Sequence, residues 1–130
     1  MSRPHFSTLV RLALIVYWTA LFVGTHVPTV PAGVAKISDK LLHYLAYGGL
    51  AVLLAMDQHA RGRWSRRRGL QIFAVVALYA AADELLQGPV GRTTDFHDWI
   101  ADLFGAACGL IAYALVVWSY NRGRSTSGEP

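Results

Sequence analysis

The sequence predicts an all-α fold, a four-helix transmembrane bundle with both termini in the cytoplasm. The 130-residue chain is 54% apolar and only 15% charged, whereas an average soluble domain has about 25% charged residues. Its long apolar runs carry no polar stripe, so a soluble bundle of these helices would have nothing to turn toward water. Its Lys and Arg residues are concentrated on one side of the predicted topology, as is typical of membrane proteins.

The four spans follow from runs close to the length of about 20 residues that an apolar helix needs to cross a bilayer. They are predicted at residues 7–26, 39–56, 69–87 and 97–120. The first run could also be a signal peptide, but its small-residue cleavage candidate lies far beyond the apolar core, which favours a retained span. Residues 1–120 then form one transmembrane domain, and residues 121–130 form a polar, disordered cytoplasmic tail.

The segments between the spans carry turn and helix-start signals. Residues 25–37 contain two prolines and a glycine, and residues 88–94 read as a short turn. Ser38 is the predicted N-cap of the second helix. Asp95, with Asp98 three residues later, predicts a start of the fourth helix that resembles a capping box.

Positive charge predicts the orientation. Five arginines lie within residues 61–68, in a loop that shares its side with both termini. That side carries nine of the twelve Lys and Arg residues, and the other side carries Lys36, Lys40 and Arg92. Because basic residues favour the cytoplasm, we expect a multi-pass protein of the cell (inner) membrane with both termini inside. The arginine block is interpreted as an orienting loop near anionic lipids of the bilayer, and no nucleic-acid partner is expected.

Six of the eight acidic residues fall on the outer side, at the edges of three spans. Residues three or four positions apart are neighbours on a helix face. Such spacing occurs in Asp39–His43, in Asp83–Gln87 with Tyr79 one turn deeper, and in Asp95–Asp98–Asp102. Asp83 and Glu84 end the third helix, where the helix dipole disfavours anions, so Arg92 or Lys40 is the expected partner.

The face of the fourth span that carries Asp102 continues through Gly105 and Gly109. This GxxxG pair lets helix backbones approach closely in lipid. We therefore expect the face to point into the bundle, although the same pair could join two copies of the chain. An ionisable group inside a span costs roughly 2.5–3.5 kcal/mol on insertion scales, so Asp102 is expected to face the interior.

These polar residues are candidates for chemistry. The candidate acid–base or cation-binding groups are Asp83, Glu84, Asp98, Asp102 and His43. No metal is specified and no cofactor is evident, although a divalent cation would neutralise such a group of carboxylates. Asp39 and Asp95 are also explained by their favourable places at helix N-termini, and a structural ion network could account for the whole set. Motifs of common enzyme classes are absent, so a catalytic role is not assigned.

Three segments together resemble the VanZ-like family of small multi-pass membrane proteins: SDKLLHYLAYGGLAVLL (38–54), DELLQ (83–87) and GRTTDFHDWIADLFGAACG (91–109). The family takes its name from a protein linked to low-level resistance to the glycopeptide teicoplanin, and most members have no assigned activity. Many relatives have asparagine where this chain has Asp102. The resemblance implies a set of polar, ligand-binding positions: Asp39, Lys40, His43, Asp83, Glu84, Gln87, Arg92, Asp95, Asp98 and Asp102.

Three functions stay open at this point. The favoured one is an outer-face polar pocket that binds a lipid-linked envelope precursor or a glycopeptide, with Arg92 and Lys40 on anionic groups of the ligand, and that is linked to teicoplanin resistance. The second is a membrane enzyme acting on an envelope lipid or a lipid phosphate. The third is a non-catalytic membrane adaptor whose polar helix edges only hold the bundle together. A transporter is disfavoured because no pair of spans is broken by Pro or Gly.

Overall fold

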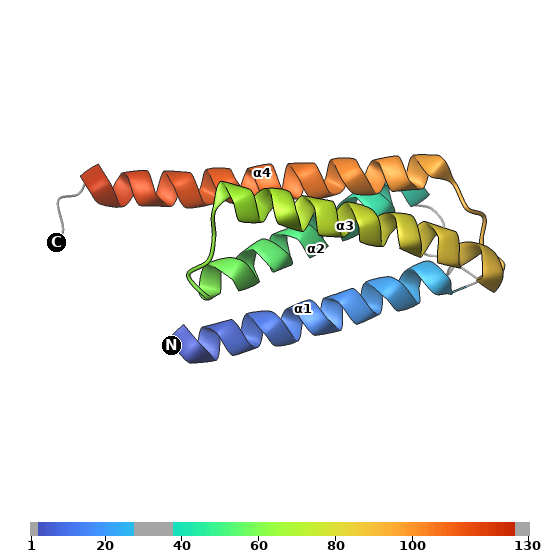
Figure 1. The fold of residues 1–130 in the computed structure, drawn as a ribbon, viewed down its shortest axis with the longest axis horizontal. Coiled ribbons are helices and arrows are strands. Elements are labelled where there is room, and N and C mark those ends of the chain that lie inside the picture. Colours follow the sequence, from blue (N-terminus) through green and yellow to red (C-terminus); the bar gives the residue numbers. More distant parts are fainter. Residues whose placement is uncertain (1–2, 28–37, 127–130) are drawn as a thin grey trace.

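The computed structural model of this chain describes residues 3–27 and 38–126. The elements in this part of the chain are all helical: α1 (Arg3–His26), α2 (Asp39–Ala60), α3 (Arg66–Gln87), the short 3-10 helix η1 (Gly88–Val90) and α4 (Phe96–Thr126). The predicted all-α, four-helix fold is confirmed (Figure 1). The proline-containing loop with Lys36, and Glu129 in the tail, lie outside the described residues.

Helix α4 extends beyond the span predicted for it. The sequence predicts a disordered tail from residue 121, but the helix continues to Thr126. Contacts between residues four apart support this extension: the Arg122 guanidinium lies 5.0 Å from the centre of the Trp118 ring, and Ser125 Oγ donates a hydrogen bond of 3.1 Å to the Asn121 carbonyl. The prediction of disorder from residue 121 is therefore wrong up to residue 126.

The two predicted helix starts are only partly as expected. Ser38 precedes α2, but its side chain makes no capping hydrogen bond. Asp95 does cap α4, because its Oδ1 accepts a hydrogen bond of 2.9 Å from the His97 backbone N–H. Asp98 does not close a capping box; its carboxylate instead accepts a hydrogen bond from Lys40 on α2. A tertiary contact thus replaces the local one.

Three helices are long and apolar enough to cross a membrane, at His5–His26, Arg66–Val90 and Phe96–Ser125. Helix α2 is not among them, because inward-facing polar residues such as His43 and Asp57 lower its mean hydropathy. At 22 residues it is about 33 Å long, enough for a bilayer core of about 30 Å, so its crossing stays a prediction. Large apolar side chains cover the sides of the bundle, including Leu70, Leu78 and Leu85, each more than 70% exposed. An apolar surface of this kind marks a membrane protein.

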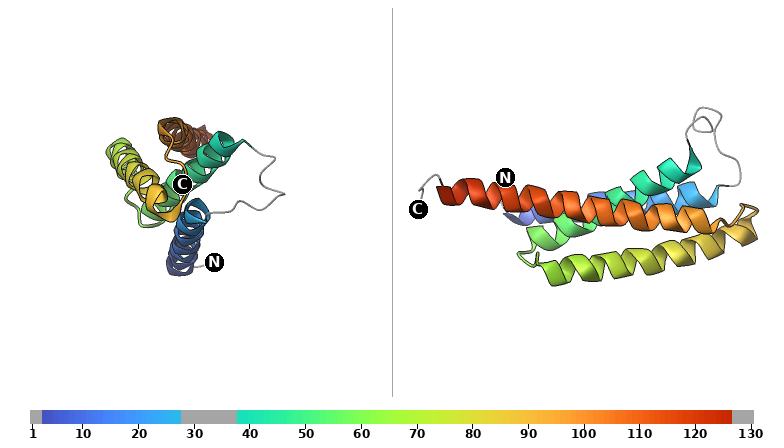
Figure 2. Two further views of the ribbon diagram at one scale, coloured as in Figure 1. Left: turned by 90° about the vertical axis from the view of Figure 1, so that its right-hand side faces the viewer. Right: turned by 90° about the horizontal axis from the view of Figure 1, so that it is seen from above.

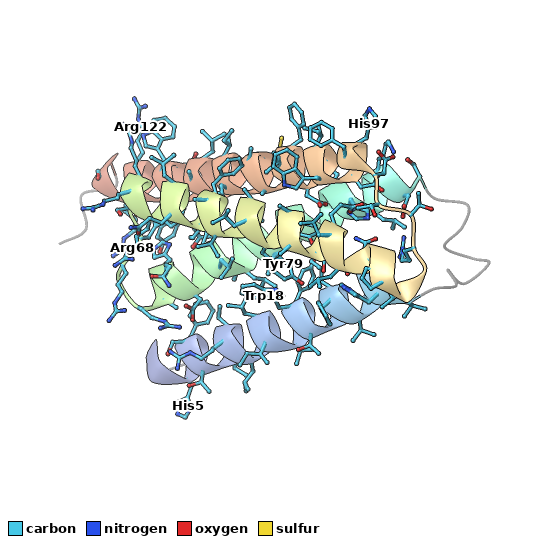
Figure 3. The ribbon with its side chains drawn as sticks, turned by 45° about the vertical axis from the view of Figure 1, so that its right-hand side comes forward. His5, Trp18, Arg68, Tyr79, His97 and Arg122 are labelled. Carbon is cyan, nitrogen blue, oxygen red and sulfur yellow. The ribbon has the colours of Figure 1, made fainter. Side chains whose placement is uncertain are left out.

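Helix α2 is the centre of the bundle. It packs against all three other helices and most extensively against α4. The start of α1, the α2–α3 turn and the end of α4 lie at one end of the molecule, which we call the arginine end (Figures 1 and 2). The other end, where α2 and α4 begin, is the acidic end. Figure 3 shows Arg68 and Arg122 at the former and His97 at the latter. Which end faces the cytoplasm stays a prediction.

Glycines bring the backbones of α2 and α4 into direct contact. A Cβ atom on Gly48 would lie 3.0 Å from the Gly105 carbonyl oxygen, and one on Gly109 would lie 2.6 Å from the Gly48 carbonyl oxygen. The GxxxG face therefore points into the bundle, as predicted. Association of two copies through Gly105 and Gly109 stays a prediction, and it would require this internal contact to be exchanged for an external one.

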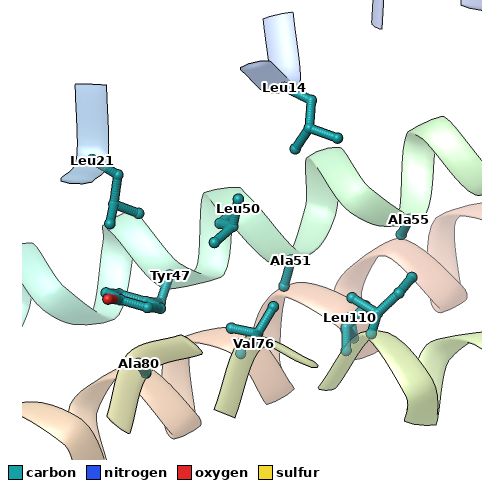
Figure 4. Packing of buried hydrophobic residues seen from close by; sticks show 11 residues of the cluster. Leu14, Leu21, Tyr47, Leu50, Ala51, Ala55, Val76, Ala80 and Leu110 are labelled. Atoms are coloured by element: carbon teal, nitrogen blue, oxygen red, sulfur yellow. The ribbon is translucent and has the colours of Figure 1, made fainter. Parts of the chain in front are cut away.

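An apolar core fills the middle of the bundle between the two ends. Helix α1 contributes a stripe at helical spacing through Val10, Leu14 and Leu21. Trp18 of α1 and Tyr79 of α3 meet edge to face with ring centroids 5.1 Å apart (Figure 3). Figure 4 shows how the inner residues interlock across α1, α2, α3 and α4: Leu14, Leu21, Tyr47, Leu50, Ala51, Ala55, Val76, Ala80 and Leu110. This core fixes the helices on which the polar residues of the acidic end are mounted.

The arginine end holds one buried carboxylate. Asp57 is 2% exposed. An Arg61 Nη atom lies 2.6 Å from Asp57 Oδ2, and Arg11 Nε lies 3.8 Å from Asp57 Oδ1. Arg61, a member of the arginine block, therefore pairs with the buried Asp57 at this end of the bundle.

Candidate functional site

The ten predicted ligand-binding residues meet at the acidic end of the bundle. We call them the polar cluster: Asp39, Lys40, His43, Asp83, Glu84, Gln87, Arg92, Asp95, Asp98 and Asp102. Six of them are buried, namely His43, Asp83, Glu84, Gln87, Asp98 and Asp102. Buried polar groups are costly unless they are hydrogen-bonded, so their partners determine what the cluster can do.

Lys40 joins the starts of α2 and α4 at the rim of the cluster. Its Nζ lies 2.9 Å from Asp95 Oδ2 and 3.3 Å from Asp98 Oδ1. The hydrogen bond from Lys40, together with those from His97, holds the pKa of Asp95 well below its usual range. Asp95 is therefore ionised at neutral pH, and this side of the cluster is an ion network.

His43 and Asp102 form the deepest polar contact between α2 and α4. His43 Nδ1 lies 3.0 Å from Asp102 Oδ1, and the two side chains are 5% and 0% exposed. With Asp102 ionised and His43 neutral, Nδ1 donates this hydrogen bond and Nε2 keeps its lone pair for a ligand. The second oxygen, Asp102 Oδ2, is buried without a hydrogen-bond partner among the described residues.

Asp83 lies in the interior, among hydroxyl groups from three helices. Tyr47 donates a hydrogen bond of 2.9 Å to Oδ2, and Thr25 donates one of 3.2 Å to Oδ1. The Tyr79 hydroxyl is 3.5 Å from Oδ1 and His26 Nδ1 is 3.7 Å from it. Asp83 thus ties the end of α1 to α2 and α3.

Glu84 faces the start of α4 rather than a basic residue. One of its oxygens accepts a hydrogen bond from the Asp95 backbone N–H, and the other accepts one of 3.2 Å from Gln87 Nε2. The expectation that Lys40 or Arg92 pairs with the two carboxylates at the end of α3 is therefore wrong. Those carboxylates point into the bundle, whereas the two basic side chains stay at its rim, paired with the aspartates of α2 and α4.

Arg92 holds the η1 turn against the neighbouring helices. Its Nη2 lies 3.6 Å from Asp39 Oδ1, and its Nη1 donates a hydrogen bond of 3.3 Å to the Gly24 carbonyl. Its backbone N–H is bonded to the Gln87 carbonyl at 3.1 Å. With 14% of its side chain exposed, Arg92 is largely committed to the protein.

Three residues of this region were missed by sequence reasoning: Thr25, His26 and Tyr47. Tyr47 follows Asp39 and His43 at spacings of four, so helical periodicity alone could have found it. Thr25 and His26 carry no such signal, because only the tertiary packing of α1 brings them to Asp83.

A shallow apolar groove adjoins the cluster between α3 and α4. Its volume is about 360 Å³, and it is lined by Ala81, Glu84, Leu85, Thr94, Phe96 and Trp99. Leu85 and Phe96 are 73% and 66% exposed, so the groove opens on the apolar side of the bundle. Glu84 lines the groove and also belongs to the polar cluster. The two features are therefore continuous.

The comparison with known families bears on the whole bundle. The VanZ/LLP1 family matches residues 4–117, which include α1 as well as the three segments that carry the resemblance. The chain belongs to the VanZ/LLP1 family. Neither a curated protein nor a solved structure matches the chain. With its apolar helices, the chain is thus a VanZ-like membrane protein, and the arrangement of its polar cluster has to be interpreted from its own geometry.

The cluster as a whole is acidic. The described acidic end carries six carboxylates, those of Asp39, Asp83, Glu84, Asp95, Asp98 and Asp102, but only two permanently basic side chains. Carboxylates accept hydrogen bonds from hydroxyl and N–H groups and coordinate cations. The cluster is therefore suited to a ligand that brings donors or positive charge.

Proposed function

We propose that the polar cluster and the adjoining groove bind one amphiphilic ligand, a lipid-linked precursor of the cell envelope, and that the protein acts as a binding protein in the membrane. The position of Glu84 carries this proposal, because this residue lines the apolar groove and is also hydrogen-bonded into the polar cluster. A ligand with a polar headgroup joined to an apolar chain would occupy both surfaces at once.

The headgroup is best supported as one rich in hydroxyl and N–H donors. Six carboxylates at the acidic end offer acceptors, whereas both basic side chains are already paired with aspartates. Sugar and peptide headgroups of envelope precursors supply such donors. Lys40, whose side chain is 51% exposed, is the cation best placed to meet a phosphate between headgroup and chain.

The groove is large enough for part of an apolar chain. Its volume of about 360 Å³ lies in the usual range for ligand pockets, roughly 300–1,000 Å³. The exposed Leu85 and Phe96 lead from it to the surface that would face lipid. In the predicted orientation the acidic end faces outward, on the side where envelope precursors are used.

Filling the groove tests the proposal. Protein purified from its native membrane would be analysed by lipid mass spectrometry as wild type and as Ala81→Trp, which places an indole in the groove. Ala74→Trp is the matched control, because Ala74 is exposed on the same helix and does not line the groove. We expect a precursor lipid to co-purify with wild type and Ala74→Trp and to be lost from Ala81→Trp. Equal lipid content in all three would contradict the proposal.

A glycopeptide is the second candidate ligand for the same cluster. The link to teicoplanin comes from the VanZ-like resemblance, and the carboxylates suit the N–H donors of a peptide. Expression in a susceptible host should raise the inhibitory teicoplanin concentration, and alanine at Asp83, Arg92 or Asp102 should abolish the effect at matched protein levels. Full resistance in all three variants would contradict a role of the cluster.

An enzymatic role has one specific observation in its favour, the hydrogen-bonded His43–Asp102 pair. A carboxylate that orients an imidazole is the arrangement of a general base. Release of phosphate from envelope lipids by the purified protein, lost in His43→Gln, would support a lipid phosphatase. If His43→Gln changes stability but neither lipid content nor turnover, the third possibility, a membrane adaptor held together by polar contacts, is favoured instead.

A further inference from the structure

We propose that Asp39, His43 and Asp98 form a binding site for one divalent transition-metal ion, such as Zn²⁺ or Mn²⁺. One oxygen or nitrogen from each of these side chains lies within 4.8 Å of the others. Among the described residues this is the group of His, Cys, Asp and Glu side chains that meets this distance. Metal–ligand bonds of about 2.0–2.2 Å would draw the three atoms somewhat closer together.

The helix geometry presents the three donors to one point. Asp39 and His43 are one turn apart on α2, so their side chains lie on the same face. Asp98 comes from the first turn of α4, which packs directly on α2. His43 and Asp98 are buried and Asp39 is exposed, so an ion would be held from within and reached from the rim.

Asp102 prepares His43 to act as a metal ligand. Its Oδ1 lies 3.0 Å from His43 Nδ1, which leaves Nε2 as the free nitrogen of the ring. Histidines that bind metals usually donate their other N–H to a carboxylate, which fixes the ring and raises its basicity. Asp102 is wholly buried and its Oδ2 has no hydrogen-bond partner in the described part of the chain. A nearby cation would help to offset the buried negative charge of Asp102.

Two cations compete with an ion for these donors, Lys40 and Arg92. Arg92 Nη2 lies 3.6 Å from Asp39 Oδ1, a looser contact than those of Lys40. Lys40 Nζ lies 3.3 Å from Asp98 Oδ1 and 2.9 Å from Asp95 Oδ2. The Lys40 side chain is half exposed, so it can keep its shorter bond to Asp95 while Asp98 turns to a metal. Removing the Lys40 charge should therefore tighten metal binding, an effect that a merely structural ion network would not show.

One nitrogen and two oxygen donors indicate the class of metal. Imidazole favours zinc and related transition metals, and carboxylates are shared with manganese. Three protein ligands leave at least one coordination position open. If the proposed ligand is bound, an oxygen of its headgroup could fill that position. This last link rests on the proposed function, whereas the metal site itself does not.

Binding of the metal alone tests the inference. The protein, purified without lipid additives and stripped with a chelator, would be dialysed against Zn²⁺ and its metal content measured, with Co²⁺ absorption reporting on the ligands. We expect one equivalent for wild type and a loss of tight binding in His43→Gln. Asp39→Asn should behave likewise, and because Asp39 is exposed this variant should fold even if His43→Gln does not. Asp102→Asn should weaken binding about 10–100-fold at unchanged stoichiometry.

Lys40→Met and His97→Gln complete the design. The first should bind Zn²⁺ more tightly than wild type. The second removes an exposed histidine from the same end of the bundle and should leave binding unchanged. No binding by wild type, or equal binding by wild type, His43→Gln and Asp39→Asn, would overturn the inference. The Ala81→Trp lipid experiment is independent of it, so a failure of the metal site and a failure of the proposed function are distinguishable.

Discussion

Replacing Gly105 with alanine is expected to separate α4 from α2 and to break the deepest contact of the polar cluster. A methyl group at Gly105 would overlap the Tyr44 carbonyl oxygen and lie 2.8 Å from the carbonyl carbon, whereas ordinary contact begins at 3.4 Å. Both atoms belong to the backbone and cannot rotate away. Relieving the contact with the carbon alone requires a separation of about 0.6 Å.

The same movement acts directly on the His43–Asp102 pair. His43 precedes Tyr44 in α2, and Asp102 lies one turn before Gly105 in α4. A separation of about 0.6 Å would lengthen the 3.0 Å distance between His43 Nδ1 and Asp102 Oδ1 to about 3.6 Å, which is no longer a hydrogen bond. The substitution thus reaches the candidate site without changing any of its residues.

The expected loss in the free energy of unfolding is about 3 kcal/mol. Overpacking costs roughly 1–3 kcal/mol, and leaving a buried carboxylate without its partner costs roughly 1–3 kcal/mol. Replacing glycine by alanine in a helix returns about 1 kcal/mol. The packing terms therefore outweigh the gain in helix propensity.

Reversible unfolding in mixed micelles, followed by circular dichroism as SDS is added, would measure this loss. Gly123→Ala is the control on the same helix, because a Cβ atom there would meet nothing within 4 Å. The control should be as stable as wild type or up to about 1 kcal/mol more stable. A Gly105→Ala protein with wild-type stability would refute the close approach of α2 and α4 described above.

Three further predictions concern the network and the orientation. Tyr47→Phe should lower the free energy of unfolding by about 1–3 kcal/mol, because it leaves the buried Asp83 Oδ2 without its hydrogen-bond donor. The Tyr79 hydroxyl is more distant from Asp83, so Tyr79→Phe should have a smaller effect in the same SDS titration. Because the folded-state pKa of Asp95 lies below its usual value, its contact with Lys40 should stabilise the fold above about pH 4, and this stabilisation should be lost as the pH falls further. The free energies of unfolding of wild type and Asp95→Asn should therefore differ at pH 7 and converge in acid. A difference that stays constant with pH would contradict this. A reporter that works only in the cytoplasm should be active when fused to the C-terminus, and a reporter that works only outside should be inactive there; the reverse result would invert the predicted orientation.

The bundle could be predicted from the sequence because each helix contains a long uncharged run, even though α2 is less apolar than the other three helices. The inward face of α4 was also predictable, since Asp98, Asp102, Gly105 and Gly109 follow helical spacing and the structure packs this face on α2. The end of α4 was not predictable from hydropathy. Residues 121–126 are polar but stay helical, because contacts between residues four apart continue there.

The gathering of the polar helix edges at one end of the bundle was predictable, but their pairing was not, and Thr25, His26 and Tyr47 were missed. Helical spacing placed Asp83 on an inward face, but its hydrogen-bond donors come from α1, α2 and α3. No local sequence pattern predicts the contact between Thr25 and Asp83. Charge alone suggested Arg92 or Lys40 as the partners of Asp83 and Glu84. Those two residues lie at helix starts and turns at the rim, so they pair with the nearer carboxylates of Asp39 and Asp95.

The most direct measurement of the central claim is photo-crosslinking to lipid from two positions on α3. Leu85 and Leu78 are both 73% exposed on the apolar side of the bundle, but only Leu85 lines the groove beside the polar cluster. A photoreactive residue would be placed at each position in the native membrane, and the captured lipids would be identified by mass spectrometry. We predict that position 85 captures an envelope precursor enriched over bulk lipid and that position 78 captures bulk lipid. The same lipid profile from both positions would contradict a specific lipid site at the acidic end.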